Sequence, residues 1–256
     1  MTMSTNTKPL LIAHRGASRE APENTQAAFD LAWQQGADGI EADFRLTRDG
    51  QVVCLHDADT SRCSGVQLAV AAASLSELKR LDVGAWKGKC WQGERIPTLA
   101  EVLGRLPTGK RFFIELKCGP EIIAPLRQIL LAGGVPLEKL RLLTFDAQLV
   151  ARLKQLLPEV RVCLNLDYRW HWPNRNRSPS REEIWTTLES CGADGLSSRA
   201  HARLDEQFVA ELQQQGKEIH VWTVDLALNA CHYRELGVDS IMTNRPGWLR
   251  TRLTKG

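Results

Sequence analysis

Residues 111–166 contain the pattern that decides the fold: Arg111-Phe-Phe-Ile-Glu-Leu116, a helix-length segment at 120–132, Arg141-Leu-Leu-Thr-Phe145, a second such segment at 146–157, and Val160-Arg-Val-Cys-Leu-Asn-Leu166. The three short runs are rich in leucine, β-branched and aromatic side chains, which are typical of buried strands. A strand followed by a helix and then by another strand is the unit from which parallel sheets are built. This stretch therefore predicts consecutive strand–helix–strand units.

The same alternation continues toward both ends of the chain. Eight strands are predicted, at 10–13, 39–44, 111–116, 141–145, 160–166, 194–197, 218–223 and 239–242. Helix-length segments are predicted at 25–35, 98–106, 120–132, 146–157, 180–191, 205–215, 227–236 and 246–254. Eight repeats in 256 residues predict an α/β fold of the (β/α)8 TIM-barrel class. A doubly wound open sheet is the alternative, but His14-Arg15-Gly16 stands where that fold usually has a Gly-rich turn.

One stretch departs from this rhythm. Arg48-Asp49-Gly50 has the composition of a tight hairpin turn, and residues 51–55 then form a short additional strand. Residues 57–97 follow as a Gly-, Trp- and charge-containing insertion before the next helix. Because it follows the second strand, the insertion is expected at the face where such barrels hold their active sites. We expect residues 1–256 to form a single domain that contains this insertion.

The composition limits the partners and the compartment. A net charge of +3, spread along the chain, predicts neither a nucleic-acid partner nor stable membrane association. Residues 1–9 are polar, which predicts that no signal peptide is present, and no apolar run approaches the roughly 20 residues of a membrane span. Seven scattered cysteines, without a C-x-x-C pair, indicate reduced thiols. A cytoplasmic location is therefore expected.

Acidic and basic side chains gather at the predicted strand ends. Glu41 and Asp43 lie two residues apart in one strand, and Glu115 lies two residues before Lys117 in the next. Side chains at this spacing share one face of a strand, so all are expected to point into the barrel mouth. Three converging carboxylates require a cation, and one divalent ion is predicted, Mg²⁺ or Ca²⁺, with Mn²⁺ as a further candidate. The alternative is a structural layer of salt bridges with Arg15 and Lys117.

Two histidines accompany this acidic cluster. His14 follows the first strand, and His56 ends the hairpin after the second. Imidazole titrates near neutrality, so this pair is predicted to perform acid–base catalysis. The nearby cations and the absence of a Gly-x-Ser-x-Gly motif favour phosphoryl chemistry over acyl transfer.

Six sequence blocks then become recognisable: His14-Arg15-Gly16 with Pro22-Glu23-Asn24-Thr25; residues 41–57; Ile96-Pro97-Thr98-Leu99 with Glu101; Ile114-Glu115-Leu116-Lys117; Trp222-Thr223-Val224; and residues 237–246. In order and spacing they resemble the glycerophosphodiester phosphodiesterase family, particularly its short cytosolic bacterial members. The resemblance covers residues 10–247, and Phe44 departs from it where valine is more usual.

The resemblance implies cleavage of glycerophosphodiesters, such as glycerophosphocholine and glycerophosphoethanolamine, to glycerol 3-phosphate and an alcohol. It implies the following site residues: Glu41, Asp43 and Glu115 as metal ligands, His14 and His56 as catalytic acid and base, Arg15 and Lys117 as phosphate-binding cations, and Trp222 as a further candidate. Which histidine is the acid stays open, as does the choice between a cyclic phosphate intermediate and direct attack by water.

Three other functions are alternatives. One is a related barrel phosphodiesterase of the sphingomyelinase D kind, acting on lysolipid or sphingolipid. Another is a non-catalytic phosphodiester-binding module, and a third is a His-x-His metal hydrolase, whose strand-one ligand pair is missing here. For the substrate, Trp170 and Trp172 are candidates to hold a choline-like ammonium by cation–π contact.

Overall fold

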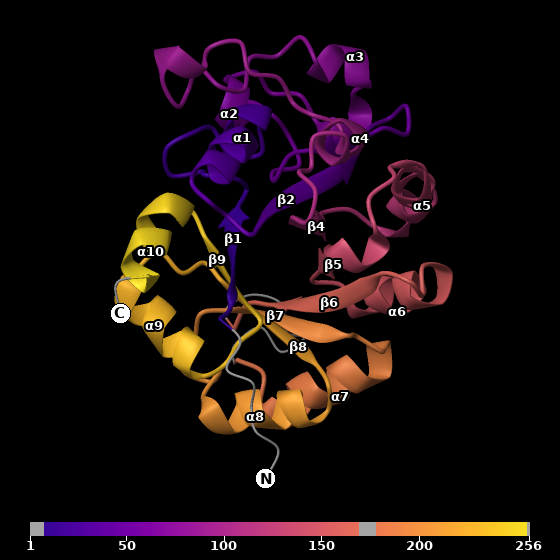
Figure 1. Ribbon diagram of the computed structural model, residues 1–256. Helices are drawn as coiled ribbons and strands as arrows, with labels where there is room; N and C mark the ends of the chain where they lie inside the picture. The colour runs from indigo at the N-terminus through magenta and orange to yellow at the C-terminus, as the bar shows by residue number, and fades with distance from the viewer. Residues whose placement is uncertain (1–7, 169–177, 255–256) are drawn as a thin grey trace.

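Eight parallel strands close into a barrel in the computed structural model, which describes residues 8–168 and 178–254 (Figure 1). The barrel strands are β1 Leu10–His14, β2 Gly39–Leu46, β4 Arg111–Leu116, β5 Leu140–Thr144, β6 Arg161–Leu166, β7 Gly195–Arg199, β8 Glu218–Trp222 and β9 Ser240–Thr243. Their order around the barrel is β1, β9, β8, β7, β6, β5, β4 and β2, and pairing of β1 with β2 completes the ring. The predicted (β/α)8 TIM barrel is confirmed.

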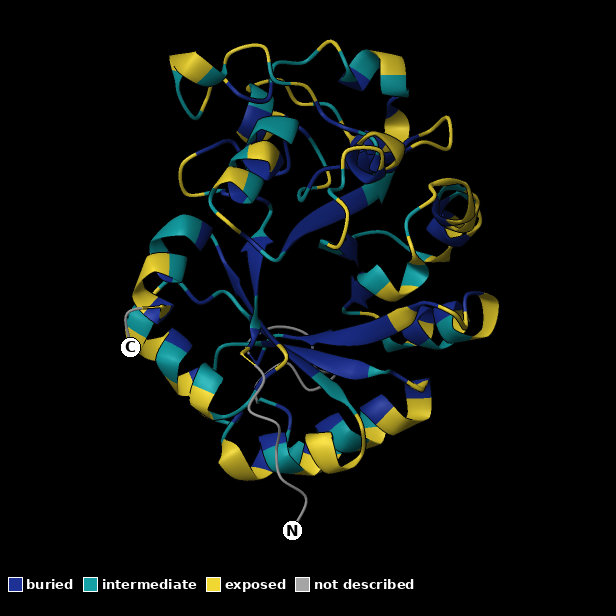
Figure 2. Cartoon of the chain, viewed as in Figure 1, coloured by how far each residue is buried: buried dark blue, intermediate teal, exposed yellow. Residues whose placement is uncertain are grey.

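Helices follow the strands and surround the barrel. They are α1 Gln26–Gln34, α4 Leu99–Leu103, α5 Ile123–Ala132, α6 Ala147–Leu156, α7 Arg181–Cys191, α8 Glu206–Gln214, α9 Ala227–Glu235 and α10 Pro246–Leu253. The strands are buried while the outer helix faces are exposed (Figure 2). The helix predicted at 98–106 is shorter than expected, because Gly104 and Pro107 disfavour its continuation. No described helix is long and apolar enough to cross a membrane.

Side-chain caps fix where several helices begin. The hydroxyls of Thr98 and Ser180 each accept a hydrogen bond from the backbone N–H of the glutamate three residues later. Glu101 and Glu183 accept in return from the backbone N–H of the cap residue. Such caps typically stabilise a helix by about 1 kcal/mol.

The barrel interior changes character along its axis. Its apolar middle is formed by Ile12, Phe113, Leu143, Cys163 and Met242. Toward the N-terminal strand ends, the Glu218 carboxylate accepts from Nε of Arg141 at 2.6 Å and lies 3.3 Å from Nε2 of His220. This end is therefore closed by a buried ionic layer, and the acidic cluster lies at the opposite end.

Glu218→Gln is expected to lower the free energy of unfolding at pH 7.5 by about 2–4 kcal/mol, because it leaves Arg141 without its charged partner. Burial alone would raise the pKa of the Glu218 carboxyl, but its interactions with His220 and Arg141 outweigh this effect, and the pKa lies below its ordinary value. The stabilisation is therefore present above the pKa of the unfolded chain, and is lost as pH falls through the folded pKa. Urea unfolding followed by circular dichroism should show the parent–variant difference shrinking below about pH 4.

Glu159 is exposed and offers a matched control: Glu159→Gln should leave the unfolding curve unchanged both at pH 7.5 and below about pH 4. A Glu218→Gln variant as stable as the parent at pH 7.5 would show that the ionic layer contributes nothing to the fold.

The chain leaves the barrel after β2 through an antiparallel hairpin. β3, Val52–Cys54, pairs with residues 44–46, and this pairing extends β2 two residues beyond its predicted end. The following segment contains the short helices α2 Ser61–Ser64 and α3 Leu75–Leu78, and lies beside α1 and α4 (Figure 1). Together with the hairpin, this segment has a separate apolar cluster: Val53, Leu55, Cys63, Val70, Ala73, Leu78, Val83 and Ile96.

Candidate functional site

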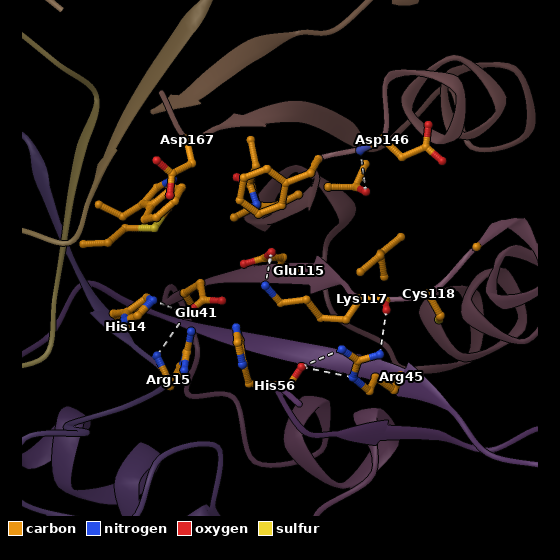
Figure 3. Close-up of a pocket in the computed structure, with 18 residues that line it drawn as sticks. His14, Arg15, Glu41, Arg45, His56, Glu115, Lys117, Cys118, Asp146 and Asp167 are labelled. Carbon is orange, nitrogen blue, oxygen red and sulfur yellow. Dashed lines mark hydrogen bonds and ion pairs between the residues drawn. The ribbon is translucent and has the colours of Figure 1, made fainter. Parts of the chain in front are cut away.

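A cavity of about 580 Å³ opens at the C-terminal ends of the strands. Its lining includes His14 from β1, Glu41 from β2, Glu115 from β4 and Trp222 from β8. Residues of adjacent strands meet there because of the sheet register: His14 pairs with Glu41, and Asp43 pairs with Glu115. Figure 3 shows side chains on or next to β1, β2, β4 and the hairpin converging on this space: His14, Arg15, Glu41, His56, Glu115 and Lys117.

The three predicted metal-binding acids are brought together and buried. One carboxylate oxygen from each of Glu41, Asp43 and Glu115 lies within 4.8 Å of the others. Within the described chain, Oε1 of Glu41 has no hydrogen-bond partner, while Oδ1 of Asp43 and Oε1 of Glu115 face only the ammonium of Lys117. These three acids could therefore hold a metal ion, with oxygen donors alone.

The electrostatics of the cluster are unbalanced. Burial, together with repulsion from Asp43 and Glu115, raises the pKa of Glu41 well above its usual range. Burial raises the pKa of Glu115 to about 7, even though Lys117 opposes the shift. Asp43 behaves differently, because Arg15 and Lys117 overcome the effect of burial and lower its pKa. An additional cation at this position would relieve the repulsion among the carboxylates.

The two predicted phosphate-binding cations lie within the cluster. Arg15 has a left-handed backbone, with φ of 57°, and its N–H donates to Oε2 of Glu41 at 2.9 Å. Its guanidinium Nε lies 3.0 Å from Oδ2 of Asp43, and its Nη1 donates to Glu23 at 3.0 Å. Lys117 contacts Asp43 at 3.2 Å and also pairs with Glu115. Salt bridges are therefore present, yet they leave Oε1 of Glu41 unpartnered among the described residues.

Both predicted histidines reach the cavity. Nδ1 of His14 lies 2.8 Å from Oδ1 of Asn244, and its Nε2 lies 3.9 Å from Oε2 of Glu41. Burial and the charge of Arg15 lower the pKa of His14 to about 4. Nδ1 of His56 lies 2.7 Å from Oδ1 of Asp57, and burial is the main cause that lowers the His56 pKa. Each ring thus has one nitrogen engaged by a fixed partner.

Supporting residues around the site were not predicted from the sequence. Arg45 donates through Nε and Nη2 to the carbonyl of His56 and through Nη1 to that of Lys117, and so ties the hairpin to β4. Asn165 and Asp167, on and just after β6, also line the cavity. Asn165 and Asp167 lie at the C-terminal end of a predicted strand, the position that also indicated the acidic residues, so the sequence did contain a signal for them.

The aromatic candidates have different outcomes. Trp222 lines the cavity, donates from its indole N–H to the carbonyl of Ser197 at 3.1 Å, and packs edge-on against Phe145. Trp170 and Trp172 lie outside the described residues, so the choline contact stays a prediction.

Comparisons with known proteins agree with this arrangement. The family model for the glycerophosphoryl diester phosphodiesterase family matches residues 14–248. A glycerophosphodiester phosphodiesterase of Caldanaerobacter subterraneus subsp. tengcongensis is 31% identical over 258 residues, which cover 97% of this chain and 99% of that protein. An Oleispira antarctica phosphodiesterase, solved in complex with the product sn-glycerol-3-phosphate, is 28% identical with a TM-score of 0.82, and the match covers 96% and 97% of the two chains.

A glycerophosphodiester phosphodiesterase from Agrobacterium tumefaciens str. C58 has a similar structure, with 27% identity, a TM-score of 0.80, and coverage of 95% of this chain and 99% of that one. The matches with these three relatives each cover 95% or more of this chain. The chain therefore belongs to the glycerophosphoryl diester phosphodiesterase family, and it is a phosphodiester hydrolase of that kind.

Proposed function

We propose that this enzyme hydrolyses glycerophosphodiesters such as glycerophosphocholine and glycerophosphoethanolamine to sn-glycerol 3-phosphate and an alcohol, with a divalent ion held by Glu41, Asp43 and Glu115. The observation that carries the proposal is the buried cluster of three carboxylates, which is flanked by two cations and two histidines that line one cavity. The product bound in the Oleispira antarctica relative supports the glycerol 3-phosphate half of the substrate.

The three acids fit a hard divalent cation. All donors are carboxylate oxygens, which suit Mg²⁺, Ca²⁺ and Mn²⁺, and the unpartnered Oε1 of Glu41 would find in the ion the partner that the described chain does not supply. When bound, the ion would polarise a phosphoryl oxygen and offset negative charge that develops in the transition state.

The remaining residues have separable roles in this proposal. Arg15 and Lys117 would hold the phosphodiester by charge-assisted hydrogen bonds. Nε2 of His14 and of His56 would carry the two protons of the reaction, one taken from the attacking group, either a substrate hydroxyl or water, and the other given to the leaving alcohol. Trp222 would form an apolar wall against the carbon skeleton of the substrate.

Release of sn-glycerol 3-phosphate from glycerophosphocholine by metal-stripped protein, with and without added Mg²⁺, Ca²⁺ or Mn²⁺, tests the proposal. Metal-restored release is the expected result. Folded protein that releases no product with any of these ions or with either head group would exclude it.

We also propose a cytoplasmic location, which the free cysteines support.

Arg62→Gln is expected to lower kcat by about 10–100-fold. From α2, Arg62 donates to Asp57 at 2.5 Å and to Glu23 at 2.8 Å, so it braces the partners of both His56 and Arg15. Steady-state kinetics with glycerophosphocholine would measure the loss. Arg48→Gln is the matched control. Arg48 pairs with Glu77, which lies in the same insertion as Arg62, and this variant should leave kcat unchanged. If both variants had parent rates, Arg62 would have no such bracing role.

A further inference from the structure

Asp225, which does not line the cavity, is hydrogen-bonded to Asn244, the partner of His14. Asp225 follows β8, and Asn244 follows β9, the barrel neighbour of β1. The Asp225 carboxylate accepts three hydrogen bonds: from the Thr243 hydroxyl at 2.8 Å, the Asn244 backbone N–H at 2.8 Å, and the Asn244 side-chain amide Nδ2 at 2.7 Å. Asp225 thus binds both the backbone and the side chain of Asn244.

These hydrogen bonds fix the orientation of the Asn244 amide. An ionised carboxylate can only accept hydrogen bonds, so the NH₂ group of Asn244 must face Asp225. The amide oxygen Oδ1 is then turned to the other side, where it lies 2.8 Å from Nδ1 of His14 and 2.9 Å from the hydroxyl of Ser18. The orientation of the amide thus follows from the carboxylate.

The amide in turn fixes the tautomer of His14. Because an amide oxygen only accepts, Nδ1 of His14 must carry its hydrogen, and the lone pair of the neutral ring lies on Nε2, on the side of Glu41. We propose that Asp225 and Asn244 are positioning residues that hold His14 in the Nδ1–H tautomer, so that Nε2 is the nitrogen that exchanges protons with substrate. This inference rests on the role proposed above for His14.

Asp225→Asn is expected to reverse the tautomer. The carbonyl oxygen of the new amide must stay on the Asn244 backbone N–H, which leaves its NH₂ group at the position of the former Oδ2. The Asn244 amide must then turn over and present its own NH₂ group to Nδ1 of His14, which moves the ring hydrogen to Nε2. In the Asp225→Asn, Asn244→Asp double variant, the carboxylate at position 244 accepts from the amide at position 225 and from Nδ1–H of His14, so the Nδ1–H tautomer should return.

Long-range ¹H–¹⁵N correlation NMR of the Mg²⁺-loaded full chain measures the tautomer directly, with the His14 signals assigned by their loss in His14→Gln. The parent and the double variant should show a protonated Nδ1, and Asp225→Asn a protonated Nε2. In Asp225→Asn, kcat should fall on the order of 10²–10⁴-fold, because the protonated Nε2 of His14 cannot accept a proton. Asp239→Asn is the control: its carboxylate accepts from the Ile219 N–H at the other end of β8, so tautomer and rate should stay as in the parent.

A protonated Nε2 in the parent, or an unchanged tautomer in Asp225→Asn, would overturn the inference. The NMR result does not depend on turnover. A parent that shows the expected tautomer but releases no glycerol 3-phosphate would contradict the proposed function and leave the positioning role intact.

Discussion

Glu41→Gln is expected to lower kcat/KM for glycerophosphocholine on the order of 1,000-fold and to remove tight binding of Mg²⁺ or Mn²⁺. The glutamine keeps the shape of the side chain, but it replaces the buried carboxylate that has an unpartnered oxygen within the described chain. Loss of Lewis-acid stabilisation of several kcal/mol corresponds to a rate effect of this size. Isothermal titration with the ion, alongside initial rates, would measure both effects.

Glu20→Gln is the matched control, because Glu20 is an exposed acid that pairs with Gln35 outside the cavity. It should bind the ion and turn over substrate as the parent does. Parent-like metal affinity in Glu41→Gln, with folded protein, would show that the carboxylate cluster does not hold the ion.

The same cluster predicts how metal-free protein responds to pH. The pKa of Glu115 is raised by burial from 4.5 to about 7, so the folded state binds a proton more tightly than the unfolded chain does. For a carboxyl with a raised pKa, the free energy of unfolding falls as pH rises between these two values. The lowered pKa values of His14 and His56 act in the opposite direction over the same pH range, so the Glu115 contribution is measured against Glu115→Gln. In thermal melts of EDTA-treated protein, the melting temperature of the parent should fall relative to that of the variant from about pH 4.5 to pH 7, and added Mg²⁺ should reverse this fall.

Glutamine at His14 or at His56 is expected to lower kcat by about 10²–10⁴-fold, because each ring would carry one proton of the reaction. The roles of the two rings can be separated with a substrate whose leaving group is p-nitrophenolate instead of choline. A good leaving group needs no protonation, so the deficit of the variant that lacks the acid should shrink, while the deficit of the variant that lacks the base should persist.

His232, which lies on α9, provides the control, and His232→Gln should retain the parent rate with both substrates. Parent-like turnover of folded His14→Gln and His56→Gln would rule out acid–base catalysis by this pair.

The barrel and the main cluster followed directly from the sequence, because both depend on short-range periodicity. Spacing of two residues places Glu41 with Asp43, and Glu115 with Lys117, on single strand faces without knowledge of distant contacts. The family resemblance covered the same positions, and the matching of residues 14–248 to the family model agrees with it.

The supporting contacts could not be predicted, because they join residues that are far apart in sequence. His14 meets Asn244 across 230 positions, and Arg45 meets Lys117 across 72. The left-handed backbone of Arg15 also gave no sequence signal, since glycine, the usual residue for that conformation, stands one position later. The contact of His14 with Asn244 depends on barrel closure, which brings the first and last strands together only in the folded state.

The bond from Arg45 to the carbonyl of His56 has a consequence for how this scaffold can vary. His56 stands on a hairpin outside the barrel, yet its main chain is anchored to the ends of β2 and β4 through one guanidinium. This anchor does not involve the chain that continues past Arg62, which reaches the hairpin through apolar contacts with Val53 and Leu55. Changes in that downstream stretch that keep these apolar contacts would therefore leave the anchored main chain of His56 in place.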